Sequence, residues 1–160
     1  VMNYWMWSVR GDKHFERFSG FMGGPVGQFL IRRFNFFVNG VMPKAIAYKS
    51  VWTTELRSQY REPLPTPADR TACAVLPKQI IAASAWLDEL WSERARIQDK
   101  PMLLLWGKQD IAFRDQELAT WRQAFAKAQC IEYPEIGHFV QEEMGEALVA
   151  PIKSFLMASN

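Results

Sequence analysis

The chain has 160 residues, of which 49% are hydrophobic and 22% are charged, and its formal net charge at pH 7 is +2. This length suits one ordinary domain with a substantial apolar core, which excludes an intrinsically disordered chain. Its 19 basic and 17 acidic residues are nearly balanced, and we interpret the only tight basic pair, Arg32-Arg33, as a solvated helix face rather than a nucleic-acid patch.

Cysteine usage and hydropathy bear on compartment and cofactors. The two cysteines, Cys73 and Cys130, provide neither a disulfide framework nor the spacing of a metal site, and there are only two histidines. We therefore expect a reducing, cytoplasmic compartment, no metal and no cofactor. No apolar run approaches the ~18 residues that span a bilayer, and the opening "VMNYWMW" lacks the basic leader of a signal peptide, so no membrane partner is expected.

Residues 1–9 are interpreted as the end of a core strand followed by a loop. The chain opens on Val1 rather than on Met, inside an apolar stretch, as expected if part of the protein lies upstream. Only Val1 to Asn3 could be strand here, and they would be the tail of one.

Residues 10–98 are predicted to form a helical cap and its connection to the core. No convincing interior strand occurs, and the helical segments are broken by Gly23-Gly24-Pro25, by Pro43 and by "EPLPTP". A longer helix is predicted after Pro77, on apolar residues at helical spacing: Ile80, Leu87, Leu90 and Trp91.

Phenylalanine is concentrated in this helical part. Seven of the 11 phenylalanines fall between Phe15 and Phe37, which gives more apolar surface than thin helices can bury among themselves. We expect this surface to pack against a sheet that lies largely outside the chain, or to roof a partly apolar substrate pocket.

Residues 99–160 read as strand, helix, strand and helix, which is α/β organisation. "MLLLW", Met102 to Trp106, is apolar on both faces, as in a buried parallel strand. "RDQELATWRQAFAK" has helical spacing, and a second short strand is predicted at Cys130 to Tyr133. One apolar stripe is predicted along a closing helix, on Leu148, Ile152, Phe155 and Leu156.

Two polar residues stand in the turns that follow the two predicted strands. Asp110 follows the first strand and His138 the second. The carboxyl ends of neighbouring parallel strands meet at one edge of a sheet, so we expect the carboxylate and the imidazole to hydrogen-bond as a catalytic pair. His14, among charged residues, is predicted to be a surface residue and not a competing base.

An acid and a base need a nucleophile for covalent chemistry. No G-x-S-x-G or G-x-D-x-G elbow occurs in the chain, since "SGFMGG" and "NGVMP" lie in the helical part and follow no strand. We expect the nucleophile to lie upstream of Val1, outside this chain.

Four segments carry a resemblance to a known family: "NYWMW", "GGPVGQFLIRRFNFFVN", "LLLWGKQDIAF" and "IEYPEIGHFVQEE". Together they resemble the second half of the haloalkane dehalogenases of the α/β-hydrolase superfamily. The resemblance covers essentially all 160 residues. It implies the C-terminal part of an α/β-hydrolase fold with a helical cap, and a nucleophile-bearing half that precedes it.

The resemblance also implies a reaction. An aspartate in the preceding half attacks the halogen-bearing carbon of a haloalkane, and a water activated by His138 hydrolyses the resulting ester, with Asp110 as the acid partner. Trp5, Trp7 and Trp52 are the candidates for halide contact, and Phe139 is expected to line the pocket. The chain alone is expected to be inactive.

Two alternatives stay open at this point. The first is another capped hydrolase: an esterase, or an epoxide hydrolase that would use Tyr48 and Tyr60 as acidic donors. The second is a non-catalytic fragment that assembles with a partner chain. Open sheet edges and bare apolar faces would drive pairing with the missing half or self-association.

Overall fold

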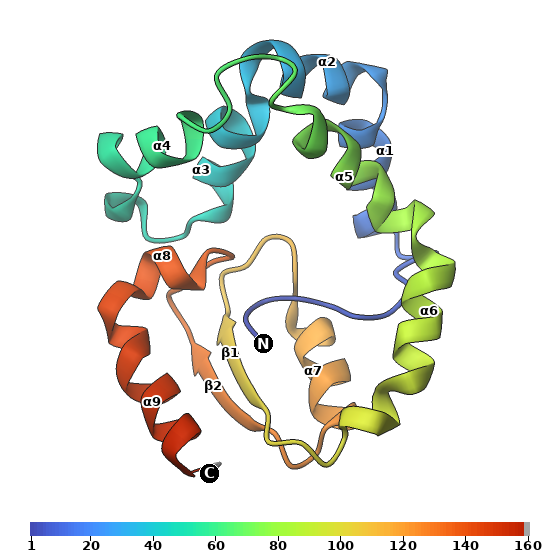
Figure 1. The fold of residues 1–160 in the computed structure, drawn as a ribbon, viewed down its shortest axis with the longest axis vertical. Coiled ribbons are helices and arrows are strands. Elements are labelled where there is room, and N and C mark those ends of the chain that lie inside the picture. Colours follow the sequence, from blue (N-terminus) through green and yellow to red (C-terminus); the bar gives the residue numbers. More distant parts are fainter. Residues whose placement is uncertain (159–160) are drawn as a thin grey trace. The chain divides into compact units, whose positions relative to one another are not determined.

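The computed structural model describes residues 1–158 (Figure 1). Two compact units make up the chain. The core unit comprises Val1–Trp5, Lys44–Val51 and the chain from Ala95 onward, and the helical unit comprises Met6–Pro43 and Trp52–Arg94. The predicted boundaries, after residue 9 and after residue 98, differ from this division, which changes after Trp5 and after Arg94 and places Lys44–Val51 with the strands.

The core unit is built on two parallel strands. β1 (Leu103–Gly107) pairs with β2 (Gln129–Tyr133) in register from Leu103↔Gln129 to Gly107↔Tyr133. Both strands were predicted, with ends shifted by a single residue. The predicted strand tail at Val1 to Asn3 contributes one parallel bridge, between Met2 and Leu105.

Helices cover the strand pair on both sides (Figure 1). α7 (Asp115–Ala124) lies on one side, and α8 (Val140–Met144) and α9 (Val149–Ala158) lie on the other, with the short 3₁₀ helix η4 (Gly145–Leu148) between them. The core cluster on the α8 and α9 side consists of Leu103, Leu105, Ile136, Val140 and Leu148. Alternate residues of β1, Leu104 and Trp106, are fully buried as well, as expected of a strand covered on both faces.

The predicted stripe on the closing helix is wrong at its last residue. Leu148, Ile152 and Phe155 belong to the core cluster, but Leu156 is 56% exposed. Leu148 ends the 3₁₀ turn η4, so the helical phase restarts at Val149. α9 consequently carries a second, exposed apolar face made of Val149, Leu156 and Met157.

Every element assigned between Lys13 and Ile97 is helical, as predicted. The longer helices are α1 (Lys13–Gly23), α2 (Pro25–Phe34), α4 (Thr54–Arg61), α5 (Thr71–Ala82) and α6 (Ser84–Ser92). The shorter ones are η1 (Phe37–Val41), α3 (Met42–Ala45), η2 (Lys49–Val51) and η3 (Glu93–Ile97).

The predicted helix after Pro77 begins earlier and is interrupted. α5 starts at Thr71 and contains Pro77, and the break comes at Ala83, before α6. A proline inside a helix removes one backbone donor, yet a helix held by tertiary packing tolerates it, and Pro77 is buried. At the break, the Ser84 hydroxyl donates to the Ile81 carbonyl at 2.7 Å and satisfies an acceptor of the ended helix.

The helical unit has its own small core. Met22, Ile31 and Ala74 are buried, with Phe18, Phe36 and Phe37 packed against them. Gly23 lets α1 approach α5 closely, because a Cβ there would lie 2.8 Å from the Lys78 Cα. The expected surplus of apolar surface is confirmed by three phenylalanines that are each more than half exposed, namely Phe21, Phe29 and Phe34.

No helix within residues 1–158 is long and apolar enough to cross a bilayer. Cys73 and Cys130 are both free thiols.

Candidate active site

Asp110 and His138 lie together in the core unit, in the turns that follow β1 and β2. The His138 Nδ1 is 2.9 Å from the Asp110 Oδ2, so the predicted contact is present. The Asp110 side chain is fully buried, whereas that of His138 is 27% exposed. Within residues 1–158 the His138 Nε2 makes no hydrogen bond. The imidazole is therefore held from one side by the carboxylate while its other nitrogen faces outward.

Two more donors fix the Asp110 carboxylate. The backbone N–H of Ala112 donates to Oδ1 at 2.6 Å, and the Asn3 side-chain amide donates to Oδ2 at 2.6 Å. A carboxylate that accepts several hydrogen bonds at fixed positions has little freedom to rotate. The orientation of His138 is set by that fixed carboxylate.

Asn3 was not predicted as a site residue. Its amide nitrogen also donates to the Gly107 carbonyl at 3.1 Å, and its Oδ1 accepts from the Gly107 N–H at 2.8 Å. A side-chain amide supplies donors and an acceptor together, as a carboxylate cannot. Asn3 has φ +32°, a positive value that asparagine adopts more readily than most residues. A lone asparagine next to a short apolar stretch gives no sequence signal for this role.

Two glycines let the Asp110 and His138 turns meet. A Cβ on Gly107 would lie 2.2 Å from the Gly137 carbonyl oxygen, and a Cβ on Gly137 would lie 2.5 Å from the Ala45 carbonyl oxygen. Only a residue without a side chain fits at either point. The Gln109 N–H donates to the Ile136 carbonyl at 2.8 Å and ties the two turns together.

Glu143 supports the histidine turn from below. Its buried carboxylate accepts from the backbone N–H groups of Gly137 (2.9 Å), Ala47 (3.0 Å) and Tyr48 (2.8 Å). The His138 N–H itself donates to the Ala45 carbonyl at 2.9 Å. The segment Lys44–Val51 thereby supports the histidine turn, and no local pattern in the sequence predicts this contact.

Aromatic rings pack against the His138 imidazole. Phe139 contacts the imidazole edge-on with ring centroids 5.0 Å apart, and Phe113 lies 5.4 Å away. Trp5 stacks on Phe113 at 5.1 Å, so two of the expected pocket residues, Phe139 and Trp5, join this group. Trp7 belongs to the helical unit, where its ring lies 4.8 Å from that of Trp91.

The described residues contain an acid and a base but no nucleophile elbow. Across residues 1–158 neither strand is followed by G-x-S-x-G or G-x-D-x-G. In the same range no three His, Cys, Asp or Glu side chains are grouped as metal ligands. The arrangement can take a proton at the His138 Nε2 and stabilise the resulting imidazolium through Asp110.

The family model for the alpha/beta hydrolase fold matches residues 39–144, which include both Asp110 and His138. This chain belongs to the alpha/beta hydrolase fold family. The fold class predicted from the sequence is thus confirmed. In alpha/beta hydrolases an acid and a histidine in this chain order follow the nucleophile.

Among alpha/beta hydrolases, the chain resembles haloalkane dehalogenases, as its motifs predicted. It is 34% identical over 152 residues to haloalkane dehalogenase 2 of Mycobacterium tuberculosis, and the match covers 94% of this chain and 52% of the relative. A cis-3-alkyl-4-alkyloxetan-2-one decarboxylase of Xanthomonas campestris is 28% identical over 157 residues, which is 94% of this chain and 48% of that protein.

Solved structures agree on the fold. The haloalkane dehalogenase DatA from Agrobacterium tumefaciens C58 superposes with a TM-score of 0.77 at 23% identity, over 96% of this chain and 54% of that one. The haloalkane dehalogenase DbeA from Bradyrhizobium elkani superposes with a TM-score of 0.70 at 25% identity, over 90% of this chain and 52% of DbeA. The chain spans about half the length of the relatives that it matches.

Proposed function

We propose that this chain supplies the base and the acid of a haloalkane dehalogenase-like hydrolase. The observation that carries the proposal is the 2.9 Å contact between His138 Nδ1 and a fully buried Asp110 carboxylate, with the His138 side chain partly open to solvent. The similarity to haloalkane dehalogenase 2 supports the proposed substrate class, a small haloalkane with water as the second reactant.

The proposed reaction has two steps. An aspartate from a part of the fold outside this chain attacks the halogen-bearing carbon, so that a carbon–oxygen bond forms and halide leaves. The His138 Nε2 then takes a proton from water while the water oxygen attacks the ester carbonyl. The bond between the carbonyl carbon and the alkoxy oxygen breaks, and the alcohol leaves with a proton from the imidazolium. The aspartic acid that remains releases its proton to solvent, which regenerates the carboxylate nucleophile.

Asp110 has two tasks in this scheme. It accepts the Nδ1–H of His138, which leaves the lone pair on Nε2, and it stabilises the positive charge of the imidazolium. Asn3 is a positioning residue, because it acts on His138 only through Asp110.

The substrate contacts are assigned to aromatic residues. Phe139 and Trp5, with Phe113 between Trp5 and the imidazole, form the apolar wall beside His138. Trp7 stays a candidate for halide contact from the helical unit, which we assign as the cap. Trp and Phe edges carry partial positive charge, which suits contact with a departing halide.

We also infer that the chain requires the rest of the fold for activity. Its relatives are about twice as long, and α9 presents an exposed apolar face at Val149, Leu156 and Met157. The complementing half, in the same polypeptide or in trans, would supply the nucleophile and cover such faces. Self-association through them is the competing outcome.

The test is halide release from 1-bromobutane. The chain alone is expected to be inactive, and the chain completed with the N-terminal half of haloalkane dehalogenase 2 is expected to turn over. His138→Gln should halt the completed enzyme after one halide per site and leave an alkyl ester that mass spectrometry detects. His14→Gln, in α1 of the helical unit, is the matched control and should keep full turnover.

Three outcomes would contradict the proposal. Steady turnover by His138→Gln would remove the histidine from the reaction. Halide release by the isolated chain, abolished by His138→Gln, would place the nucleophile inside the 160 residues. Turnover of an ester or epoxide, with none of 1-bromobutane, would favour the other capped hydrolases.

A further inference from the structure

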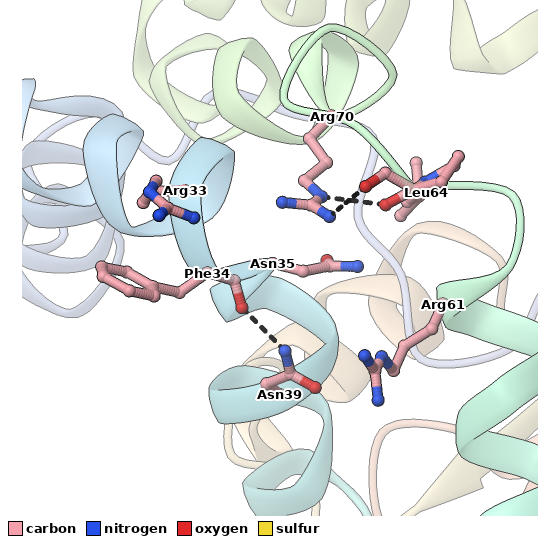
Figure 2. A pocket seen from close by; sticks show the side chains of 8 residues that line it. Arg33, Phe34, Asn35, Asn39, Arg61, Leu64 and Arg70 are labelled. Carbon is pink, nitrogen blue, oxygen red and sulfur yellow. Dashed lines mark hydrogen bonds between the residues drawn. The ribbon is translucent and has the colours of Figure 1, made fainter.

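A cavity in the helical unit is lined by three arginines. It measures about 210 Å³ and lies where the end of α2, the end of α4 and the start of α5 come together (Figure 2). Arg33, Arg61 and Arg70 line it, and no carboxylate does. One water molecule occupies ~30 Å³ of liquid, so the cavity has room for a small polyatomic ion.

Arg70 is held rigidly at the wall of this arginine cavity. Its guanidinium donates to the carbonyls of Leu64 (2.9 Å), Pro65 (2.8 Å) and Arg32 (2.7 Å). A guanidinium has five N–H donors, so three carbonyl acceptors leave two donors unused. Asp69, the neighbouring acid, is engaged by the Thr66 N–H at 2.9 Å and does not line the cavity.

Among the residues that the structure describes, the other two arginines have no neutralising partner. Arg61 is exposed at the end of α4, and in the part of the chain that the structure describes it makes no hydrogen bond or ion pair. Arg33 lies over the Phe34 ring, with its guanidinium carbon 5.7 Å from the ring centroid. Like charges around one cavity repel one another and raise the local concentration of anions.

Asn35 presents a buried hydrogen-bond acceptor that a ligand could satisfy. It ends α2 in the left-handed conformation (φ 49°, ψ 46°) and is only 3% exposed. Its Oδ1 has no hydrogen-bond partner within residues 1–158. A buried acceptor without a donor costs free energy, so a ligand that brings a donor would be favoured here.

The remaining polar side chain of the cavity is already satisfied. The Asn39 amide nitrogen donates to the Phe34 carbonyl at 2.7 Å, as Figure 2 shows, and its Oδ1 accepts from Arg57 at 3.0 Å. The free hydrogen-bonding capacity is therefore arginine donors together with one acceptor, the Asn35 Oδ1.

We propose that this cavity binds an oxyanion that carries its own O–H, of the hydrogen phosphate class. Arg33, Arg61 and Arg70 would donate to the anionic oxygens, and the ligand hydroxyl would donate to the Asn35 Oδ1. Sulfate and halides lack that hydroxyl at neutral pH, so the site discriminates against them. All of these residues belong to the helical unit, and the site is separate from the Asp110–His138 pair.

The test is calorimetric titration of the purified protein with inorganic phosphate and with sulfate, at constant ionic strength and pH 8. Phosphate is expected to bind about threefold to tenfold more tightly than sulfate, the ratio that one neutral hydrogen bond provides. Methyl phosphate has its second ionisation near pH ~6 and has no O–H at pH 8. Methyl phosphate is therefore expected to bind as weakly as sulfate. If methyl phosphate bound as tightly as inorganic phosphate, the ligand would be a phosphate monoester and the requirement for a ligand hydroxyl would be overturned.

Three variants separate the charge from the hydroxyl contact. Arg61→Gln should weaken phosphate and sulfate equally, by about fivefold to tenfold. Asn35→Gly retains the left-handed backbone at no steric cost and should lower phosphate affinity to the sulfate level, with sulfate unchanged. Asn35→Asp retains the side-chain shape but places a negative charge against the ligand, and should abolish binding of both anions.

Arg17→Gln is the matched control, since Arg17 is exposed in α1 and does not line the cavity. Equal affinities of Arg61→Gln and Arg17→Gln would overturn the site. Equal affinities of wild-type protein for phosphate and sulfate would overturn the role of Asn35. Unchanged phosphate binding by a folded Asn35→Asp variant would do the same.

Discussion

The Asn3 side-chain amide donates a 2.6 Å hydrogen bond to the Asp110 carboxylate across 107 positions of sequence. The same side chain holds both backbone polar groups of Gly107. The start of the chain and the acid turn thus form one hydrogen-bonded unit beneath His138.

Replacing Asn3 is expected to destabilise the acid turn. Asn3→Gly removes the side chain but keeps the positive φ, and should lower the free energy of unfolding by about 2–3 kcal/mol, because buried Gly107 groups lose their partners. Asn3→Ala should cost about 0.5–1 kcal/mol more, since alanine resists positive φ. Chemical denaturation of the three proteins measures both differences, and equal stability of Asn3→Gly and wild type would remove Asn3 from the support of Asp110.

A methyl group at Gly107 is expected to push the two turns apart. Gly107→Ala places a Cβ 2.2 Å from the Gly137 carbonyl oxygen and should destabilise the protein by about 1–3 kcal/mol through overpacking. Gly20→Ala is the control, because nothing lies within 4 Å of its Cβ, and it should stabilise α1 by about 0.5–1 kcal/mol. Thermal melting distinguishes them, and shifts of the same sign would contradict the packing argument.

Glu143 is expected to be essential to the histidine turn. Glu143→Gln places an amide NH₂ donor against backbone N–H donors. It should lower the free energy of unfolding by about 2–3 kcal/mol. The matched control is Glu146→Gln, at an exposed residue of η4, which should change stability little. Urea denaturation gives both values. Hydrogen exchange at the Ala47 and Tyr48 amides should rise in Glu143→Gln alone.

Glu132 provides a test at acid pH. Hydrogen bonds from the Lys108 ammonium, which has the larger effect, and from the Arg122 guanidinium lower the pKa of the Glu132 carboxyl below its usual range. A lowered folded-state pKa stabilises the protein above the unfolded value and loses that contribution as pH falls through the folded value. The free energy of unfolding of wild type should therefore be about 0.5–1 kcal/mol higher than that of Glu132→Gln at pH 7. This difference should vanish well below pH ~4.5. A constant difference down to pH ~2 would show that Glu132 acts by another route.

The exposed face of α9 is expected to mediate association. Leu156→Lys should reduce self-association of the chain, or its affinity for a complementing half, without lowering its stability, because Leu156 is already 56% exposed. Leu76→Lys in α5, 62% exposed, is the matched control. Sedimentation velocity at micromolar concentration measures both, and identical behaviour of the two variants would exclude α9 as the contact.

The sequence predicted those features that local pattern determines. β1 and α7 carry their signals within a few residues, as an apolar run and a helical spacing. The Asp110–His138 pair followed from the rule that parallel strand ends share an edge. The supporting roles of Asn3 and Glu143 are not predicted from the sequence, because their partners lie about a hundred residues away and the residue type alone does not indicate such a contact.

Where local pattern misled, tertiary packing was the reason. The spacing predicts a helix that begins after Pro77, but Pro77 is buried inside α5 and the break falls at Ala83. Leu156 fits an apolar period and yet is exposed, since the phase of the helix is set after η4. Propensity is a weak guide at such positions.

The placement of Lys44–Val51 with the strands has a consequence for engineering. Exchange of the whole segment 6–94 for that of a relative would also exchange the Ala45 carbonyl and the Ala47 and Tyr48 amides. A chimera that keeps residues 44–51 and replaces only Met6–Pro43 and Trp52–Arg94 leaves those supports of His138 in place. The helical unit therefore has to be exchanged as two separate segments, while the eight residues Lys44–Val51 between them are kept from the original protein.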